Sequence, residues 1–81
     1  MMTQTKKPTL LSLRQKMGMT TTQLAQYAGV SLTEAYVVEI GGFVDPETAR
    51  RVVAAFSQLS GTFCTIDDIR LQNIPRMQYY T

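Results

Sequence analysis

The stretch Thr20–Ile40 reads TTTQLAQYAGVSLTEAYVVEI and contains two short helical patterns that meet at an Ala-Gly-Val corner. Each pattern opens with a capping box, because Thr20 is followed three residues later by Gln23, and Ser31 three residues later by Glu34. In a capping box the side chain and the backbone satisfy each other's unpaired polar groups. Both helices are therefore expected to begin at defined residues.

Gly29 supplies the corner between these two helices. A chain that ends one helix and starts another within about three residues needs a residue at positive φ, which glycine adopts without strain. The small side chain of Ala25 lets the second helix cross close over the first. We expect a helix-turn-helix at about residues 20–40, with apolar contacts from Leu24, Val30, Ala35 and Val38.

Helical patterns continue on both sides of this stretch. Leu10, Leu13 and Met17 recur at three- and four-residue spacing and predict a first helix that stops at Gly18. The sequence Asp45-Pro46-Glu47 combines an N-cap, a proline at the first helical position and an acid in the first turn. In all, five helices are expected, at about residues 9–17, 21–27, 32–40, 46–60 and 65–71. The buried face of the fourth is expected at Ala49, Val52, Val53, Phe56 and Leu59.

Composition and length bound the possible functions. The chain has 81 residues, of which 44% are hydrophobic and 17% charged, as expected for one compact domain. It has no apolar run of about 20 residues and no signal-peptide pattern, so we expect a soluble, cytoplasmic protein. The net charge of +2 permits nucleic-acid binding without requiring it.

Catalytic and metal chemistry is not expected. The chain has no histidine and one cysteine, Cys64, so neither an internal disulfide nor a metal or nucleophile site can be assembled from these residue types. Cys64 is expected to be a small apolar core residue. We therefore expect a protein that is not an enzyme and that uses no metal or cofactor.

Three regions are expected along the chain. Residues 1–8 are polar and form a flexible N-terminal arm, residues 9–72 form the helix-turn-helix domain, and residues 73–81 form a C-terminal tail. The tail contains Ile74, Met77, Tyr79 and Tyr80, which carry much apolar area for a solvated end. It is therefore expected to contact a second subunit, a partner or the domain itself.

The run LRQKMGMTTTQLAQYAGVS, residues 13–31, resembles the Cro/repressor-type (XRE-like) helix-turn-helix DNA-binding family. That family's pattern has Leu-Arg, then Gly-Leu-Ser/Thr, Leu-Ala and Gly-Val-Ser, with a Glu eight residues further on, and the similarity extends over about residues 10–71. The matching positions are Leu13, Arg14, Gly18, Met19, Thr20, Leu24, Ala25, Ala28, Gly29, Val30, Ser31, Glu39 and Gly41. The resemblance implies an all-α, compact five-helix bundle of the phage-repressor type, in which Arg14 and Glu39 form a structural ion pair.

The resemblance also implies a DNA-binding surface on the third helix. Its exposed early positions, which read base edges in the major groove, correspond to Leu32, Thr33, Tyr36 and Val37. Thr33 and Tyr36 can form hydrogen bonds there, and Leu32 and Val37 can contact thymine methyl groups. Glu34 lies beside them and can accept a hydrogen bond from cytosine, or it can serve only the Ser31 capping box.

Phosphate contacts are implied at fewer positions than in the family. Thr21 stands where the family has a phosphate-contacting Gln, and Lys6, Lys7 and Lys16 are the other candidates, although each can equally be an ordinary solvated charge. Arg50 and Arg51 can also lie near a phosphate. The loop GGFVD at residues 41–45 lacks the basic residues that the family commonly places there.

Two functions remain open after this comparison. The first is a sequence-specific DNA-binding transcriptional regulator that acts as a homodimer on double-stranded DNA, and the extent of the resemblance favours it. The second is a protein-interaction module, such as a regulator or antagonist of another DNA-binding protein. It would use the apolar face of the third helix, with Leu32, Tyr36, Val37 and Phe43. Positive charge around that face would favour DNA binding, and a neutral apolar patch would favour a protein partner.

Overall fold

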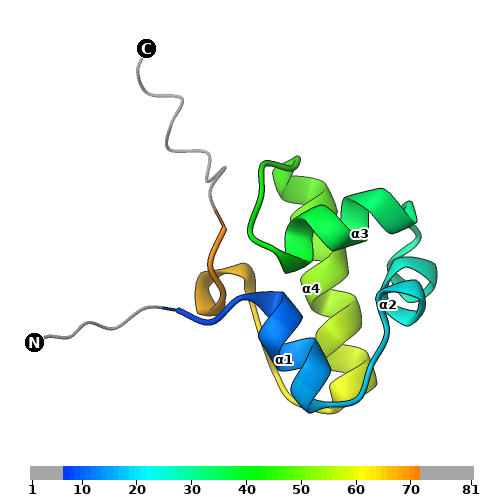
Figure 1. Ribbon diagram of the computed structural model, residues 1–81, viewed down its shortest axis with the longest axis vertical. Helices are drawn as coiled ribbons and strands as arrows, with labels where there is room; N and C mark the ends of the chain where they lie inside the picture. The colour runs from blue at the N-terminus through cyan, green and yellow to red at the C-terminus, as the bar shows by residue number, and fades with distance from the viewer. Residues whose placement is uncertain (1–6, 72–81) are drawn as a thin grey trace, which may run out of the picture.

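The computed structural model describes residues 7–71 (Figure 1). This part of the chain forms four α-helices and one turn of 3-10 helix, and it contains no strand, so the expected all-α class is confirmed. The elements are α1 (Leu10–Lys16), α2 (Thr21–Ala28), α3 (Leu32–Glu39), α4 (Pro46–Ser60) and η1 (Ile66–Asp68). Within these residues, no helix is long and apolar enough to cross a membrane.

The expected start signals of the helices are present. The Thr20 hydroxyl accepts a hydrogen bond from the backbone N–H of Gln23, and the Gln23 side chain accepts one from the backbone N–H of Thr20. Ser31 and Glu34 make the same reciprocal pair at the start of α3. At the start of α4, the Asp45 carboxylate accepts hydrogen bonds from the backbone N–H groups of Glu47 and Thr48. Short side chains placed next to apolar patterns thus determine where these helices begin.

The corner of the helix-turn-helix lies at Gly29, as expected. Gly29 has a φ of 74°, in the left-handed region, and its N–H donates to the carbonyl of Ala25 at 2.9 Å. The side chain of Ala25 is buried, so α2 and α3 pack closely together. The turn therefore fixes how α3 is presented relative to α2.

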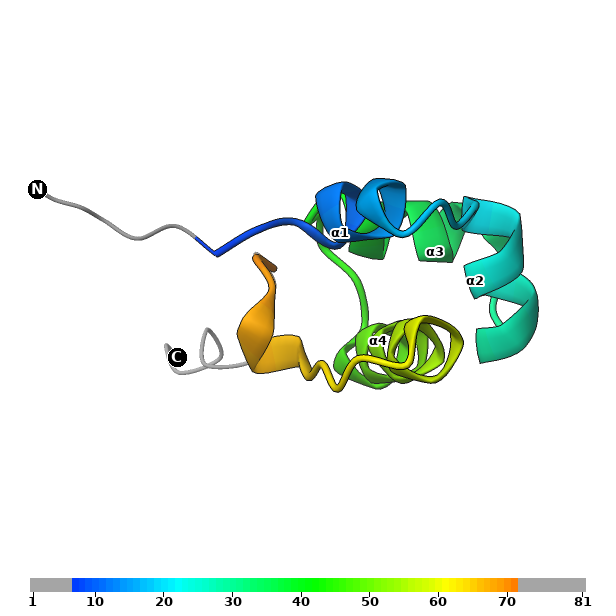
Figure 2. The same ribbon diagram turned by 90° about the horizontal axis from the view of Figure 1, so that it is seen from below.

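The helices form two layers. Figure 2 shows α1 and α3 in one layer and α4 in the other, with α2 closing one end between them. Both α2 and α3 pack against α4. Buried apolar residues from the four helices and from the connecting segments form the core: Leu10, Met19, Leu24, Ala25, Ala35, Val38, Ala49, Val52, Val53, Ala55, Phe56, Cys64 and Ile69. The expected core position of Cys64 is confirmed.

The expected burial of Leu59 is wrong, since its side chain is 41% exposed. The buried positions of α4 end at Phe56, so the last turn of the helix extends beyond the residues that could cover it. Ala55 is buried instead, near the C-terminal end of α2, where it lines a hollow together with Tyr27 and Ala28. Helical spacing identified the correct face of α4 but not how far the core extends along it.

The expected fifth helix over residues 65–71 is also wrong, because only the single 3-10 turn Ile66–Asp68 forms. The Asp68 carboxylate accepts a hydrogen bond from the backbone N–H of Thr65 at 2.9 Å and closes this turn. Ile69 then adopts an extended conformation and is buried in the core. The extended backbone also lets the N–H of Arg70 donate to the carbonyl of Pro8 at 2.9 Å. These contacts replace those that a longer helix would make.

Residues from three parts of the chain meet beside this segment. The Arg70 guanidinium donates to the carbonyl of Lys7 at 3.1 Å. Gly41, at the end of α3, has a φ of 78°, and a Cβ placed on it would lie 2.8 Å from the carbonyl oxygen of Arg70. The start of the described chain, the end of α3 and the segment after η1 are thus held together. The whole expected C-terminal tail, residues 73–81, and the arm through Lys6 lie outside the described residues.

Candidate functional site

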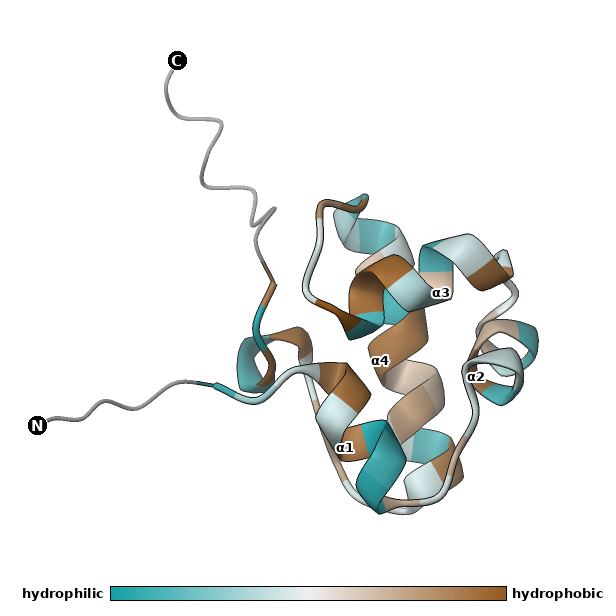
Figure 3. Ribbon diagram, in the orientation of Figure 1, coloured by the Kyte–Doolittle hydropathy of each residue, from teal (hydrophilic) through white to brown (hydrophobic). Residues whose placement is uncertain are grey.

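An apolar stripe runs along the exposed side of α3 and into the following loop. Leu32, Tyr36 and Ile40 follow one another at four-residue spacing, which places them on one helix face. Their exposed fractions are 55%, 49% and 44%, and that of Phe43 is 71%. Figure 3 shows hydrophobic residues recurring along α3 and in the loop after it. We call these four residues the α3 stripe.

A shallow hollow lies between the start of α2 and the first two turns of α3. It has a volume of about 420 Å³ and is lined by Thr21, Thr22, Leu32, Thr33 and Tyr36. Three of the four residues expected to read bases, Leu32, Thr33 and Tyr36, are thus brought together at one exposed place. The capping box of Ser31 and the turn at Gly29 set their position, because they fix where α3 begins.

Val37, the fourth residue expected to read bases, does not line this hollow. Its side chain is half-buried, and a Cβ placed on Gly42 would lie 3.0 Å from Val37 Cγ1. The Val37 carbonyl also accepts a hydrogen bond from the N–H of Gly42 at 2.9 Å. The turn after α3 folds back over this position, which sequence spacing alone does not reveal.

Thr21 has an internal role in place of the expected phosphate contact. Its hydroxyl donates to Oε1 of Glu39 at 2.9 Å. A threonine hydroxyl carries one hydrogen, so it cannot donate to a phosphate at the same time. The exposed hydroxyl at this end of α2 belongs to Thr22, which the sequence analysis did not single out.

The expected ion pair between Arg14 and Glu39 is present. Arg14 Nε lies 2.9 Å from Glu39 Oε2, and the Glu39 side chain is 0% exposed. Neither of these two atoms has another polar partner within residues 7–71. Arg14 Nη1 also donates to the carbonyl of Met19 at 2.7 Å. With the hydroxyl of Thr21, these contacts join α1, the start of α2 and the end of α3.

Glu34 is engaged at the start of α3. Its Oε1 accepts a hydrogen bond from the backbone N–H of Ser31 at 3.0 Å. This geometry is that of the capping box, the simpler of the two roles considered for this residue.

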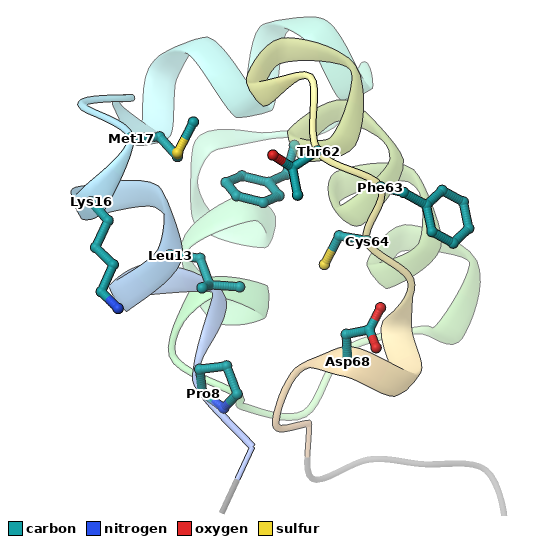
Figure 4. A pocket seen from close by; sticks show the side chains of 9 residues that line it. Pro8, Leu13, Lys16, Met17, Thr62, Phe63, Cys64 and Asp68 are labelled. Atoms are coloured by element: carbon teal, nitrogen blue, oxygen red, sulfur yellow. The ribbon is translucent and has the colours of Figure 1, made fainter.

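Positive charge is absent from the helix-turn-helix itself, since Thr21–Glu39 contains no lysine or arginine. Lys16, a candidate phosphate contact, is exposed and does not line the hollow at α3. Lys16 lines a different hollow together with Met17, Phe63 and Asp68 (Figure 4). It lies in the last turn of α1, on the side that faces the chain after α4.

Among residues 7–71, no lysine or arginine lines the hollow at α3. Arg50 and Arg51 pair with Glu47 on the exposed surface of α4, at 3.2 and 3.4 Å. Lys7 is exposed at the start of the described chain, and Lys6 lies outside the described residues. The hollow at α3 is therefore lined by apolar and hydroxyl groups.

The hollow beside Lys16 is mostly apolar and has a volume of about 380 Å³ (Figure 4). Phe63, in the loop after α4, is 86% exposed at its edge, and the sequence analysis had not considered it. Burial, together with the nearby Asp68 carboxylate, raises the pKa of the Cys64 thiol, so the thiol stays protonated at neutral pH. Cys64 is the one cysteine of residues 7–71, and no group of three or more His, Cys, Asp or Glu side chains that could hold a metal ion occurs among them.

No protein-family model matches the chain, and neither a curated protein nor a solved structure matches it. The surface chemistry of α2 and α3 is therefore the basis for assigning a function.

Proposed function

We propose that this chain is a cytoplasmic DNA-binding transcriptional regulator of the Cro/repressor (XRE-like) type, which inserts α3 into the major groove. The observation that supports the proposal is the pairing of α2 and α3 across the left-handed Gly29, with Leu32, Thr33 and Tyr36 exposed on α3. Two helices joined by such a turn form the arrangement in which the second helix reads base edges. In this proposal η1 takes the place of the fifth helix of a phage-repressor bundle.

The proposed contacts follow from the chemistry of the exposed groups. The hydroxyls of Thr33 and Tyr36 form hydrogen bonds to base edges, and Leu32 contacts apolar groups. Thr22 and the lysines of the arm, Lys6 and Lys7, contact phosphates.

These contacts are few for one chain. We therefore propose a homodimer, since two linked copies of α3 on two half-sites bind far more tightly than one. Sedimentation of the full chain measures this directly, and a monomeric mass at every concentration used for DNA binding would contradict it.

A second function is supported by a different observation. The α3 stripe is apolar, and no cation lies within Thr21–Glu39. A cluster of exposed apolar residues without charge is typical of protein interfaces, whereas DNA-binding surfaces are usually basic. The alternative is a protein-interaction module whose partner, such as another DNA-binding protein, packs on the stripe.

Selection from a random library of DNA duplexes tests the first function. The full chain should enrich a defined sequence, and Tyr36→Ala should abolish the enrichment. Tyr27→Ala is the matched control, because Tyr27 is an exposed tyrosine of α2 that does not line the hollow at α3. A full chain that enriches no duplex over background would overturn DNA recognition and leave the interaction module as the function to test.

A further inference from the structure

The groups that α3 offers to a base edge are unusually restricted. The helix reads LTEAYVVE and contains no Arg, Lys, Asn or Gln. In its first two turns, the hydroxyls of Thr33 and Tyr36 are the polar groups that line the hollow, since the Glu34 carboxylate is turned to the backbone of Ser31. The other side chain that α3 contributes to the hollow is the exposed, apolar Leu32.

This restriction limits which features of DNA can be recognised. Guanine is usually read by Arg or Lys at its O6 and N7 atoms, and adenine by Asn or Gln at its N6 and N7 atoms. Neither kind of reader is present on α3. The one apolar group that the major groove presents is the C5-methyl of thymine. A cytosine methylated at C5 carries the same group at the same position on the ring.

The geometry of the hollow suits such a group. Leu32 and Tyr36 are one helical turn apart, line the same hollow, and each keep about half of their surface exposed. Both can therefore bury further apolar surface on binding. Because no lysine or arginine among residues 7–71 lines the hollow, apolar contact is the main means by which it can discriminate between bases.

We infer that the hollow between Leu32 and Tyr36 receives the C5-methyl group of a pyrimidine, so that each half-site is read through thymine or 5-methylcytosine. The inference rests on the proposed DNA-binding function and names the ligand of that site. Tyr36 and Thr33 add hydrogen bonds at the neighbouring base edge.

Replacement of thymine by uracil in the selected duplex tests this directly, because uracil keeps every hydrogen-bonding group of thymine and lacks only the methyl. The full chain should bind the uracil duplex about fourfold more weakly for each contacted methyl, the factor that corresponds to burying one such group. Leu32→Ala should bind the thymine and uracil duplexes equally, whereas Tyr27→Ala should keep the wild-type preference.

A second experiment distinguishes thymine from 5-methylcytosine as the base that carries the methyl group. At each position where uracil weakens binding, the T·A pair is replaced by a C·G pair with or without the C5-methyl. A gain of about fourfold on methylation extends the ligand to 5-methylcytosine, and the absence of a gain confines it to thymine.

The outcomes distinguish this inference from the proposed function. Enrichment of a duplex that binds equally well with thymine and uracil at every position would overturn methyl recognition and leave DNA binding intact. A uracil effect that persists in Leu32→Ala would place the methyl elsewhere and also overturn the inference. Failure to enrich any duplex would overturn the DNA-binding function itself.

Discussion

Arg14 and Glu39 join the first and third helices through an ion pair in which the carboxylate is completely shielded from solvent. Their 2.9 Å contact lies directly behind the helix-turn-helix, because Glu39 is the last residue of α3 and also accepts the hydroxyl of Thr21 at the start of α2. A buried charge is tolerated only with its partners in place. The orientation of α3 therefore depends on these three side chains together.

Arg14→Ala is expected to lower the free energy of unfolding by about 3–5 kcal/mol, since it leaves the Glu39 carboxylate buried without its counter-charge. Urea unfolding followed by circular dichroism measures the loss. Arg50→Ala is the control, because Arg50 makes an exposed ion pair with Glu47 and should cost under about 1 kcal/mol. Equal stabilities of the two variants would show that burial of the first pair has no energetic consequence.

Thr21→Val is expected to destabilise the domain by about 1.5–3 kcal/mol, because it removes a hydrogen bond to a charged group. Thr22→Val, an exposed neighbour in the same turn, should change stability by under about 0.5 kcal/mol. For DNA affinity the opposite is expected: if Thr22 contacts a phosphate, Thr22→Val should weaken binding more than Thr21→Val. A large stability loss in Thr22→Val and none in Thr21→Val would contradict the assigned roles.

Gly41→Ala is expected to be more harmful than Gly18→Ala. Both glycines have positive φ, at 78° and 72°, so each substitution should cost about 1–2 kcal/mol for the left-handed backbone alone. Around Gly18 there is open space, whereas at Gly41 the new Cβ would lie 2.8 Å from the Arg70 carbonyl oxygen and force that backbone apart. Thermal unfolding of both variants measures the difference, and similar losses would mean that the Arg70 segment moves freely.

The pH dependence of stability is expected to change on Cys64→Ala. Burial and the Asp68 carboxylate raise the pKa of this thiol above its ordinary value of 9.0. The unfolded chain therefore loses the proton at lower pH than the folded protein, and stability contributed by the protonated thiol falls as pH rises above about 9. The wild-type protein should lose more stability than Cys64→Ala between neutral pH and pH about 10. If the wild-type protein and Cys64→Ala lost the same stability over this pH range, the raised pKa of the thiol would be contradicted.

The salt dependence of DNA binding is expected to be shallow. If Lys6 and Lys7 provide the phosphate contacts, the slope of log K against log salt should be about −2 for each bound chain, at about −0.9 for each neutralised phosphate. Replacing both lysines by alanine should weaken selected and random duplexes alike, whereas Tyr36→Ala should weaken the selected duplex more. Titration of labelled duplexes at several salt concentrations measures these effects, and a slope steeper than about −5 per chain would require cations that this assignment omits.

The boundaries of the helices followed from local chemistry. Thr20, Ser31 and Asp45 mark helix starts because each can satisfy unpaired N–H groups within three residues, whatever the rest of the chain does. Gly29 marks the corner because a positive φ there is a local requirement. The ion pair of Arg14 and Glu39 was expected only from a family pattern, since nothing in the spacing of these two residues predicts their contact.

The surroundings of the site depended on contacts between distant segments. Thr21 donates to Glu39 because α2 and α3 meet at an angle that no local signal specifies, and Val37 is covered because the chain turns back at Gly42. Residues 69–71 favour helix locally, yet the burial of Ile69 and the bond from Arg70 to Pro8 stabilise an extended backbone there.

The sequence by itself thus determined the all-α class, four of the helices and the corner between α2 and α3, because capping, turn conformation and apolar spacing act over a few residues. Only the tertiary structure decided which side chains are left to act at the surface. It turned the Thr21 hydroxyl toward Glu39, placed Val37 outside the hollow at α3 and left Leu32, Thr33 and Tyr36 exposed there, because exposure is a property of the packed helices and not of any one of them.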